Sequence, residues 1–255
     1  MNDTINEYLK IFRLPAIREN YPAIADKCAK ESSSYSDFLL KILECEMKEK
    51  IERSKRTVLK FAGFPAIKTL EMFDFSSSAV NRSQIMELTS LKFIENAENI
   101  ILVGPSGVGK THLALSLGYI AAQNRIRTRF ITLSDLLFQL ETVRDQKRLK
   151  EYFKQYVNNI NLLIIDELGY LRLNEMQSNL FFQLINKRYE KNSIIITSNL
   201  SFLKWKEVLN NDEALTAAVL DRLIHHSHII NVSGESFRLK QKRKAGILYE
   251  GGENL

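Results

Sequence analysis

The chain has 255 residues, of which 45% are hydrophobic and 26% are charged, and its formal net charge is +6. This length and composition are those of an ordinary globular protein with one large core and a small accessory domain. No apolar run approaches the roughly 18 residues of a membrane span, and the polar start excludes a signal or transit peptide, so we expect a cytoplasmic protein with no membrane partner. The positive charge favours anionic partners, nucleic acid first.

Residues 1–75 are predicted to form a small N-terminal helical domain. The sequence Ser-Tyr-Ser-Asp at 34–37 is typical of a capping box, and it opens a long helix that Gly63 and Pro65 end. Acidic and basic side chains alternate at i, i+4 spacing along 41–60, so much of this charge is self-neutralised and a solvated face is favoured. The apolar face of the helix comprises Phe38, Leu39, Ile42, Leu43 and Ile51.

From residue 99 onward, short apolar runs alternate with amphipathic segments, which is typical of βαβ units and a parallel sheet. A serine-rich connector and a helical stretch at 83–96 precede this pattern, so we assign 76–235 to an α/β domain and 236–255 to a basic C-terminal tail. Continuous apolar runs predict strands that are covered on both faces. The predicted strands are 99–103, 128–133, 162–166, 193–198 and 228–232, with helices between them.

The first predicted strand runs into a complete phosphate-binding loop, GPSGVGKT, which a helix-like segment follows. In this pattern, glycines let successive backbone N–H groups converge on phosphates, and the helix N-terminus adds its positive dipole end. Lys110 is expected to reach the β- and γ-phosphates, and the Thr111 hydroxyl to ligate Mg²⁺. The sequence therefore predicts a site for ATP and Mg²⁺. Its residues are Gly104, Pro105, Ser106, Gly107, Val108, Gly109, Lys110, Thr111 and His112, the last packing near the phosphates.

Two later strands end in polar residues that suit ATP hydrolysis. Asp166 and Glu167 follow four apolar residues, which is the pattern of a Walker B motif. Asp166 is predicted to hold Mg²⁺, and Glu167 to orient and activate the attacking water. Asn199 follows the strand at 193–198, and we expect its amide to contact the γ-phosphate or the lytic water without transferring a proton.

Arg222 lies on an otherwise apolar helix just before the fifth strand, and it is our candidate arginine finger. An arginine supplied by a neighbouring subunit accelerates phosphoryl transfer by about 10³–10⁵. The alternatives are an intrachain pair with Asp221 or a charge at the helix C-terminus. Arg188 is a weaker second candidate for the same role.

No metal site beyond that for Mg²⁺ is predicted. His225, His226 and His228 lack a nearby set of cysteines or carboxylates with zinc spacing, and strand alternation sends His225 to the opposite side from the other two. We expect structural or nucleotide-proximal imidazoles. Cys28 and Cys45 have no CxxC spacing and are expected to be reduced, structural thiols.

The C-terminal tail is dense in basic side chains that have no acidic residues close by in the sequence. Unpaired charge of this kind suits the phosphate backbone of DNA, which carries no sequence information. The alternative is a tail that only aids solubility. The predicted DNA contacts are Arg238, Lys240, Lys242, Arg243 and Lys244.

In their order and spacing, these motifs resemble those of the AAA+ ATPases of the initiator and helicase-loader group. The resemblance is closer to the IstB-like transposition helper proteins, which are encoded beside a transposase in two-gene insertion sequences. The phosphate loop and Walker B motif indicate only a P-loop ATPase, whereas Asp-Glu-Leu-Gly-Tyr at 166–170 and Asp-Arg-Leu-Ile-His-His at 221–226 narrow the resemblance to this family. Other matching segments lie at 14–17, 64–67, 91–99, 186–189, 195–199 and 234–240.

The resemblance implies an AAA+ domain with a five-stranded parallel sheet in the order 5-1-4-3-2 and a small N-terminal helical domain. The chain departs from the wider AAA+ pattern in one respect, because only about 23 residues follow the last predicted strand, too few for the usual multi-helix lid, so we expect no C-terminal lid. The resemblance also implies homo-oligomers that assemble on double-stranded DNA with ATP, deform it or select a target site, and stimulate a cognate transposase. The alternatives that stay open are a bacterial replicative-helicase loader, a nucleotide-gated scaffold with little hydrolysis and, least favoured, a small-molecule kinase.

Overall fold

The computed structural model describes residues 2–154, 159–237 and 240. The chain divides into two compact units, Met1–Thr57 and Val58–Leu255. This boundary lies earlier than the predicted one at residue 75, because the segment that follows Thr57 packs within the larger unit. Leu70 belongs to a core of that unit, and Phe73 packs against the same core. Each unit is described separately below.

The smaller unit contains α1 (Asn2–Ile11), α2 (Pro15–Lys30) and most of α3 (Tyr35–Ala62). The predicted capping box is present at the start of α3, where Ser34 Oγ accepts from Asp37 N at 3.1 Å and Asp37 Oδ2 accepts from Ser34 N at 3.2 Å. Further along α3, Glu49 pairs with Arg53 at 3.6 Å and with Arg56 at 2.6 Å. These pairs neutralise part of the charge of the helix, as predicted from the spacing.

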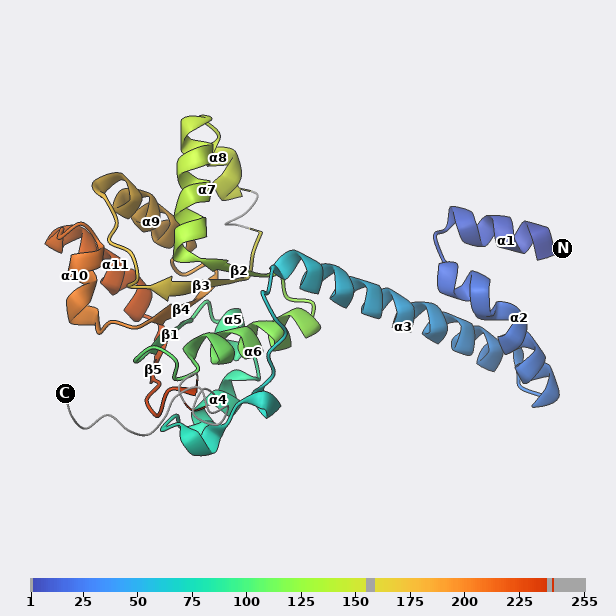
Figure 1. Ribbon diagram of the computed structural model, residues 1–255. Coiled ribbons are helices and arrows are strands. Elements are labelled where there is room, and N and C mark those ends of the chain that lie inside the picture. Colours follow the sequence, from blue (N-terminus) through green and yellow to red (C-terminus); the bar gives the residue numbers. More distant parts are fainter. Residues whose placement is uncertain (1, 155–158, 238–239, 241–255) are drawn as a thin grey trace. The chain divides into compact units, whose positions relative to one another are not determined.

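The larger unit is built on a five-stranded parallel sheet in the order β2-β3-β4-β1-β5, which is the predicted order read from the other side (Figure 1). The register pairs Ile101 of β1 with Ile196 of β4 and with Ile229 of β5. The strands are β1 (Asn99–Val103), β2 (Thr128–Thr132), β3 (Leu162–Leu168), β4 (Ser193–Ser198) and β5 (Ser227–Asn231). Their bounds agree with the prediction to within one residue, except that β3 continues to Leu168.

Helices cover both faces of this sheet, as Figure 1 shows. Because side chains alternate along a strand, Ile100 of β1 faces one core and Ile101 faces the other. On the first face lie α4 (Arg82–Leu88), α5 (Lys92–Glu95) and α6 (Lys110–Gln123). On the second lie α7 (Leu133–Asp145), α8 (Leu149–Tyr152), α9 (Glu175–Arg188), α10 (Trp205–Val208) and α11 (Glu213–Ile224). The apolar runs in β3 and β4 are therefore buried on both sides, as predicted.

The predicted helical stretch at 83–96 is interrupted in the structure. It consists of α4 and α5, and Leu91 between them has a φ of 63°. The chain before α4 forms two 3₁₀ turns, Leu70–Met72 and Phe75–Ser77, in place of a continuous helix. An antiparallel bridge joins Ser78 to Gly234, so the segment after β5 returns to the connector before α4.

Because the strands are parallel, their ends form two distinct edges. We call the edge where the strands end the carboxyl edge, and the edge where they begin the amino edge. The phosphate loop follows β1 at the carboxyl edge, whereas the ends of α9 and α11 lie just before β4 and β5 at the amino edge. Among the helices of the described residues, none combines the length and apolar character needed to cross a membrane.

Candidate nucleotide site

The phosphate loop connects the end of β1 to the first turn of α6 at the carboxyl edge of the sheet. Gly107 and Gly109 have φ values of 84° and 99°, which side chains other than glycine rarely adopt. A Cβ atom at Gly107 would lie 2.2 Å from Ser236 Oγ, and one at Gly109 would lie 2.6 Å from the Phe73 ring. The loop therefore requires glycine at both positions for its backbone conformation and for its close neighbours.

Lys110 begins α6 and is almost fully buried. Its Nζ atom donates to the carbonyl oxygens of Gly104 at 2.7 Å and Pro105 at 2.6 Å. The ammonium group is thus held inside the curve of the loop, where the backbone N–H groups of a phosphate-binding loop converge. This position agrees with the predicted role of Lys110 at the phosphates.

Asp166 is fixed by two hydroxyl groups that come from different elements. Thr111 Oγ1 of α6 lies 2.9 Å from Asp166 Oδ1 and 3.1 Å from Oδ2. Thr197 Oγ1 of β4 donates to Asp166 Oδ1 and accepts from the backbone N–H of Glu167 at 3.0 Å. The sequence singled out Thr111 and Asp166 but not Thr197, whose position opposite β3 depends on the pairing of β3 with β4.

Carboxylate and hydroxyl oxygens are the hard ligands that Mg²⁺ prefers. Thr111 and Asp166 bring such oxygens together at the start of α6, where the helix end also favours phosphate. The residues present therefore fit a magnesium nucleotide. Thr111 and Asp166 would hold the metal, and the metal would neutralise charge on the phosphates.

Glu167 follows Asp166 at an irregularity in the sheet. The β3–β4 register shifts between Ile165 and Leu168, and Glu167 has a φ of 69°, in the left-handed region. The strand therefore buries Asp166 while exposing the Glu167 side chain, which lines the cavity beside the phosphate loop. Strained backbone of this kind is concentrated at functional sites.

Asn199 lies just after β4 and lines the same cavity. Its Oδ1 atom is buried and has no hydrogen-bond partner among the described residues. The lack of a side chain at Gly169 makes room for it, because a Cβ atom there would lie 2.4 Å from Asn199 Oδ1. This oxygen faces Gly169, and the contact of the Asn199 amide with the γ-phosphate or the lytic water stays a prediction.

The cavity has a volume of about 580 Å³, within the usual range for small-molecule sites. Residues from two places outside the predicted motifs complete its wall: the segment 68–78 before α4, and Glu235, Phe237 and Lys240 after β5. Phe237 N donates to Gly107 O at 3.0 Å, and Lys240 Nζ lies 2.6 Å from Ser77 Oγ and 3.6 Å from Asp74 Oδ2. Hydrogen bonds from Ser76 and Ser77 and the Lys240 charge lower the pKa of Asp74.

Three of these lining residues alter the interpretation of the sequence. Lys240 was predicted to contact DNA, but the structure places it at the nucleotide cavity. Tyr170, which the sequence did not single out as a site residue, extends to the phosphate loop, with its hydroxyl 3.1 Å from Ser106 Oγ. His112 Nε2 lies 2.8 Å from Thr69 O, so it holds the 68–78 segment against α6. The other predicted DNA contacts, Arg238, Lys242, Arg243 and Lys244, lie outside the described residues.

Arg222 does not line this cavity. On α11, its Nε atom donates to Asn186 Oδ1 of α9 at 2.9 Å and its guanidinium carbon lies 5.0 Å from the centre of the Phe182 ring. Among the described residues no ion pair joins Arg222 to Asp221, and its Nη1 atom donates to Ala218 O, one turn earlier in α11, at 2.9 Å. The structure thus keeps Arg222 away from the phosphate loop of its own chain, and its role toward a neighbouring chain stays a prediction.

Arg188 is buried at the amino edge, with 1% of its surface exposed. Its guanidinium donates to the carbonyl oxygens of Ile160 at 2.9 Å, Asn161 at 3.3 Å and Ser193 at 2.8 Å. Burial lowers the pKa of Arg188 to about 9. These bonds join the chain before β3 to the first residue of β4, so Arg188 has a structural role and does not reach a nucleotide.

Proteins of one known family are similar in sequence to this chain over most of its length. The family described as IstB-like ATP binding protein matches residues 7–245. A Geobacillus stearothermophilus protein, named as an ATP-binding protein of insertion sequence IS5376, is 43% identical over 95% of this chain and 96% of its own length. A Pseudomonas aeruginosa protein, named as an ATP-binding protein of insertion sequence IS21, is 44% identical over 89% of this chain and 85% of its own.

Solved structures share the fold of the larger part of this chain. DnaI has a TM-score of 0.55 and 18% identity, covering 70% of this chain and 94% of its own. AMPPCP-bound DnaA from Aquifex aeolicus has a TM-score of 0.53 and 22% identity, covering 73% of this chain and 58% of its own. Together, the family match and the folds confirm the resemblance seen in the motifs, and the chain belongs to the IstB-like ATP-binding proteins, as an ATPase with the AAA+ P-loop fold.

Proposed function

We propose that this ATPase is an insertion-sequence helper that assembles on double-stranded DNA with ATP, deforms the DNA or selects a target site, and stimulates a cognate transposase. The observation that carries the ATP-dependent part is the cluster of Thr111, Asp166 and Thr197, which lies beside the cavity that Glu167 and Asn199 line. The insertion-sequence part is supported by relatives that are at least 40% identical and are named for insertion sequences.

The chemistry assigned to each residue follows from its position. Lys110 exchanges its two backbone carbonyls for phosphate oxygens, while Thr111 and Asp166 hold Mg²⁺. Glu167 accepts a proton from the attacking water, because it is the exposed carboxylate that lies next to this group and lines the cavity. The Asn199 side chain lines the same cavity, and its amide contacts the γ-phosphate or that water without transferring a proton.

The proposed active unit contains more than one subunit. Arg222 is remote from its own cavity, and a positive charge near the γ-phosphate is the usual means of stabilising the transition state of phosphoryl transfer. We assign that charge to Arg222 of a neighbouring copy. Assembly and hydrolysis would then depend on each other, since each copy completes the site of the next.

DNA binding is proposed from charge. The net charge of +6 and the basic tail favour a phosphate backbone, and such contacts tolerate many sequences. The likeness to DnaI extends to the fold alone, so no observation moves the proposal toward helicase loading. The proposed DNA-contact residues are Arg238, Lys242, Arg243 and Lys244, with Lys240 reassigned to the nucleotide cavity.

The deciding experiment compares three proteins on duplex DNA: wild type, Lys110→Ala and Glu167→Gln. With ATP we expect the wild type and Glu167→Gln to form DNA-bound oligomers, and Lys110→Ala to remain unassembled because its phosphate loop lacks the lysine. Target integration by the transposase of the same element, measured with and without each protein, should follow assembly. Wild-type DNA binding that is independent of ATP, or integration that this protein leaves unchanged, would overturn the proposal.

A further inference from the structure

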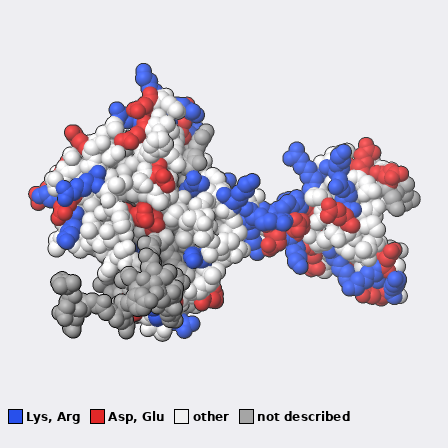
Figure 2. Space-filling model, viewed as in Figure 1, with Lys and Arg blue, Asp and Glu red and all other residues white. Residues whose placement is uncertain are grey.

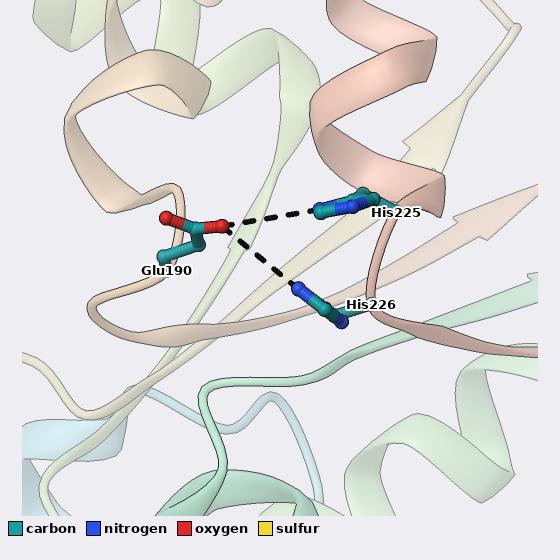
Figure 3. A group of neighbouring side chains, drawn as sticks. All are labelled: Glu190, His225 and His226. Atoms are coloured by element: carbon teal, nitrogen blue, oxygen red, sulfur yellow. Dashed lines mark ion pairs between the residues drawn. The ribbon is translucent and has the colours of Figure 1, made fainter.

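Glu190, His225 and His226 lie together on the surface at the amino edge of the sheet, where Figure 3 shows both imidazoles directed toward the one carboxylate. Glu190 Oε1 is 3.9 Å from His225 Nδ1 and 3.8 Å from His226 Nε2. One ligand atom from each side chain lies within 4.8 Å of the others. The sequence shows no set of cysteines or carboxylates with zinc spacing near these histidines, and the fold brings Glu190 to them from a distant part of the chain.

The fold holds these side chains together by local backbone geometry. The helix α11 ends at Ile224, and the chain turns into β5 at Ser227, so His225 and His226 occupy a turn and do not alternate as strand residues. Their ring centres are 4.1 Å apart. Glu190 lies in the turn between α9 and β4 and has a φ of 56°, in the left-handed region. Buried Arg188, two residues earlier, anchors that turn.

We propose that Glu190, His225 and His226 bind one transition-metal ion, with Zn²⁺ as the best fit. Imidazole and carboxylate form a borderline ligand set that suits Zn²⁺ better than Mg²⁺ or Ca²⁺, and three protein ligands leave a position for water. Tetrahedral Zn²⁺ with ligands at about 2.0–2.1 Å places ligand atoms roughly 3.3 Å apart. The two separations from Glu190 are 3.8 and 3.9 Å and all three ligand atoms lie within 4.8 Å of one another, so the exposed side chains would close by up to about 1.5 Å to bind the ion.

Tyr189 supports this arrangement. Its hydroxyl lies 2.8 Å from His225 Nδ1, which fixes the imidazole in the orientation seen. Metal binding at Nδ1 would exchange this hydrogen bond for a coordination bond.

A metal ion at this site would connect the C-terminal ends of α9 and α11. Glu190 follows α9, which supplies Asn186 to Arg222, and the histidines follow α11, which carries Arg222 itself. A bound ion would limit movement of α11 relative to α9. If Arg222 acts on a neighbouring subunit, a point that rests on the proposed function, the ion would also steady that arginine.

The test uses untagged, chelator-treated full-length protein and the metals alone. Co²⁺ titration should give a visible d–d absorption spectrum, and competition with Zn²⁺ should report one ion per chain. His226→Gln and Glu190→Gln should each weaken Zn²⁺ binding at least tenfold. The matched control is His228→Gln, because His228 lies on β5 and pairs with Glu98 at 2.8 Å, and it should retain wild-type affinity.

Thermal unfolding gives a second readout that is independent of ATP hydrolysis, because an ion that binds only the folded state raises the unfolding temperature. We expect Zn²⁺ to raise it for the wild type and His228→Gln, and not for Glu190→Gln. Hydrolysis at the wild-type rate by Arg222→Ala, with normal Zn²⁺ binding, would count against the proposed function and leave the metal site intact. Unchanged Zn²⁺ binding by a double variant, His225→Gln with His226→Gln, or no specific binding by the wild type, would overturn the metal site.

Discussion

The carboxyl and amino edges of the sheet use buried polar groups in different ways. At the carboxyl edge, Thr111 and Thr197 both donate to Asp166, and Asn199 Oδ1 has no partner among the described residues. At the amino edge, Arg188 donates to three backbone carbonyls. Side-chain partners can be exchanged for a ligand without unfolding the backbone, whereas the Arg188 bonds are part of the fold. The polar groups of the carboxyl edge are therefore suited to binding a ligand, whereas those of the amino edge hold the backbone of neighbouring strands together.

Replacing Arg222 is the strongest test of this difference between the two edges. Arg222 lies in the last turn of α11 near the amino edge, yet it is proposed to act in catalysis. Arg222→Ala should bind ATP almost normally and lose assembly-stimulated hydrolysis by about 10³-fold, together with nucleotide-dependent oligomers. Steady-state ATPase rates and light scattering measure both.

Mixing gives the control for this prediction. Arg222→Ala has an intact phosphate loop, and Lys110→Ala has an intact arginine, so mixed oligomers should regain some hydrolysis. Mixed oligomers that demonstrably form and stay inactive would exclude the trans-acting role. Arg188, buried and committed to carbonyls, could not take its place.

Replacing Arg188 tests the structural side of the comparison. Arg188→Met leaves buried carbonyls without their donor and should lower the free energy of unfolding by about 3–4 kcal/mol. Chemical denaturation measures this loss. The neighbouring exposed residue supplies the control, since Lys187→Met removes only a cation–π contact with Phe153 and should cost about 1 kcal/mol or less. Equal losses would mean that the amino edge does not depend on the buried guanidinium.

Glu167→Gln tests the carboxyl edge, where chemistry should change without loss of stability. Hydrolysis should fall by about 10²-fold or more, because the amide keeps the shape of the side chain but cannot accept the proton. ATP affinity and the midpoint of denaturation should stay close to those of the wild type. Turnover at the wild-type rate would place the general base on another residue.

The smallest expected effect concerns the basic tail. Replacing Lys242, Arg243 and Lys244 with Gln should reduce the dependence of DNA affinity on salt, since log K falls with log salt by about 0.9 per phosphate neutralised. Lys240→Gln alone should instead weaken nucleotide binding, because Lys240 lines the cavity. An unchanged salt slope in the triple variant would assign the tail to solubility.

The carboxyl edge was predictable because its functional residues follow strands directly. Lys110, Asp166, Glu167 and Asn199 each come at the end of an apolar run or in a loop with a fixed pattern, so their strands bring them to one edge. The strand bounds were predictable for the same reason, apart from the irregularity that extends β3 past Asp166.

Contacts between distant segments were not predictable from the sequence. Glu190 lies near His225 because β4 and β5, which follow these residues, lie on either side of β1 in the sheet. The local sequence pattern does not reveal this order of strands. Lys240 occurs in a run of basic residues, and its contact with Asp74 depends on a bridge between Ser78 and Gly234. The sequence pattern assigns residues 58–75 to the helical domain, yet their apolar side chains pack in the core of the larger unit.

The contact of Lys240 with Asp74 and Ser77 has a practical consequence for experiments with DNA. Because the pKa of Asp74 is lowered, its carboxylate stays charged in mild acid, and pH changes near neutrality leave the pair intact. The pair is partly exposed, so added salt weakens it. Salt would therefore loosen the wall of the nucleotide cavity and DNA binding together. A salt titration of DNA affinity measures phosphate contacts only when the fraction of protein carrying ATP is followed in the same samples.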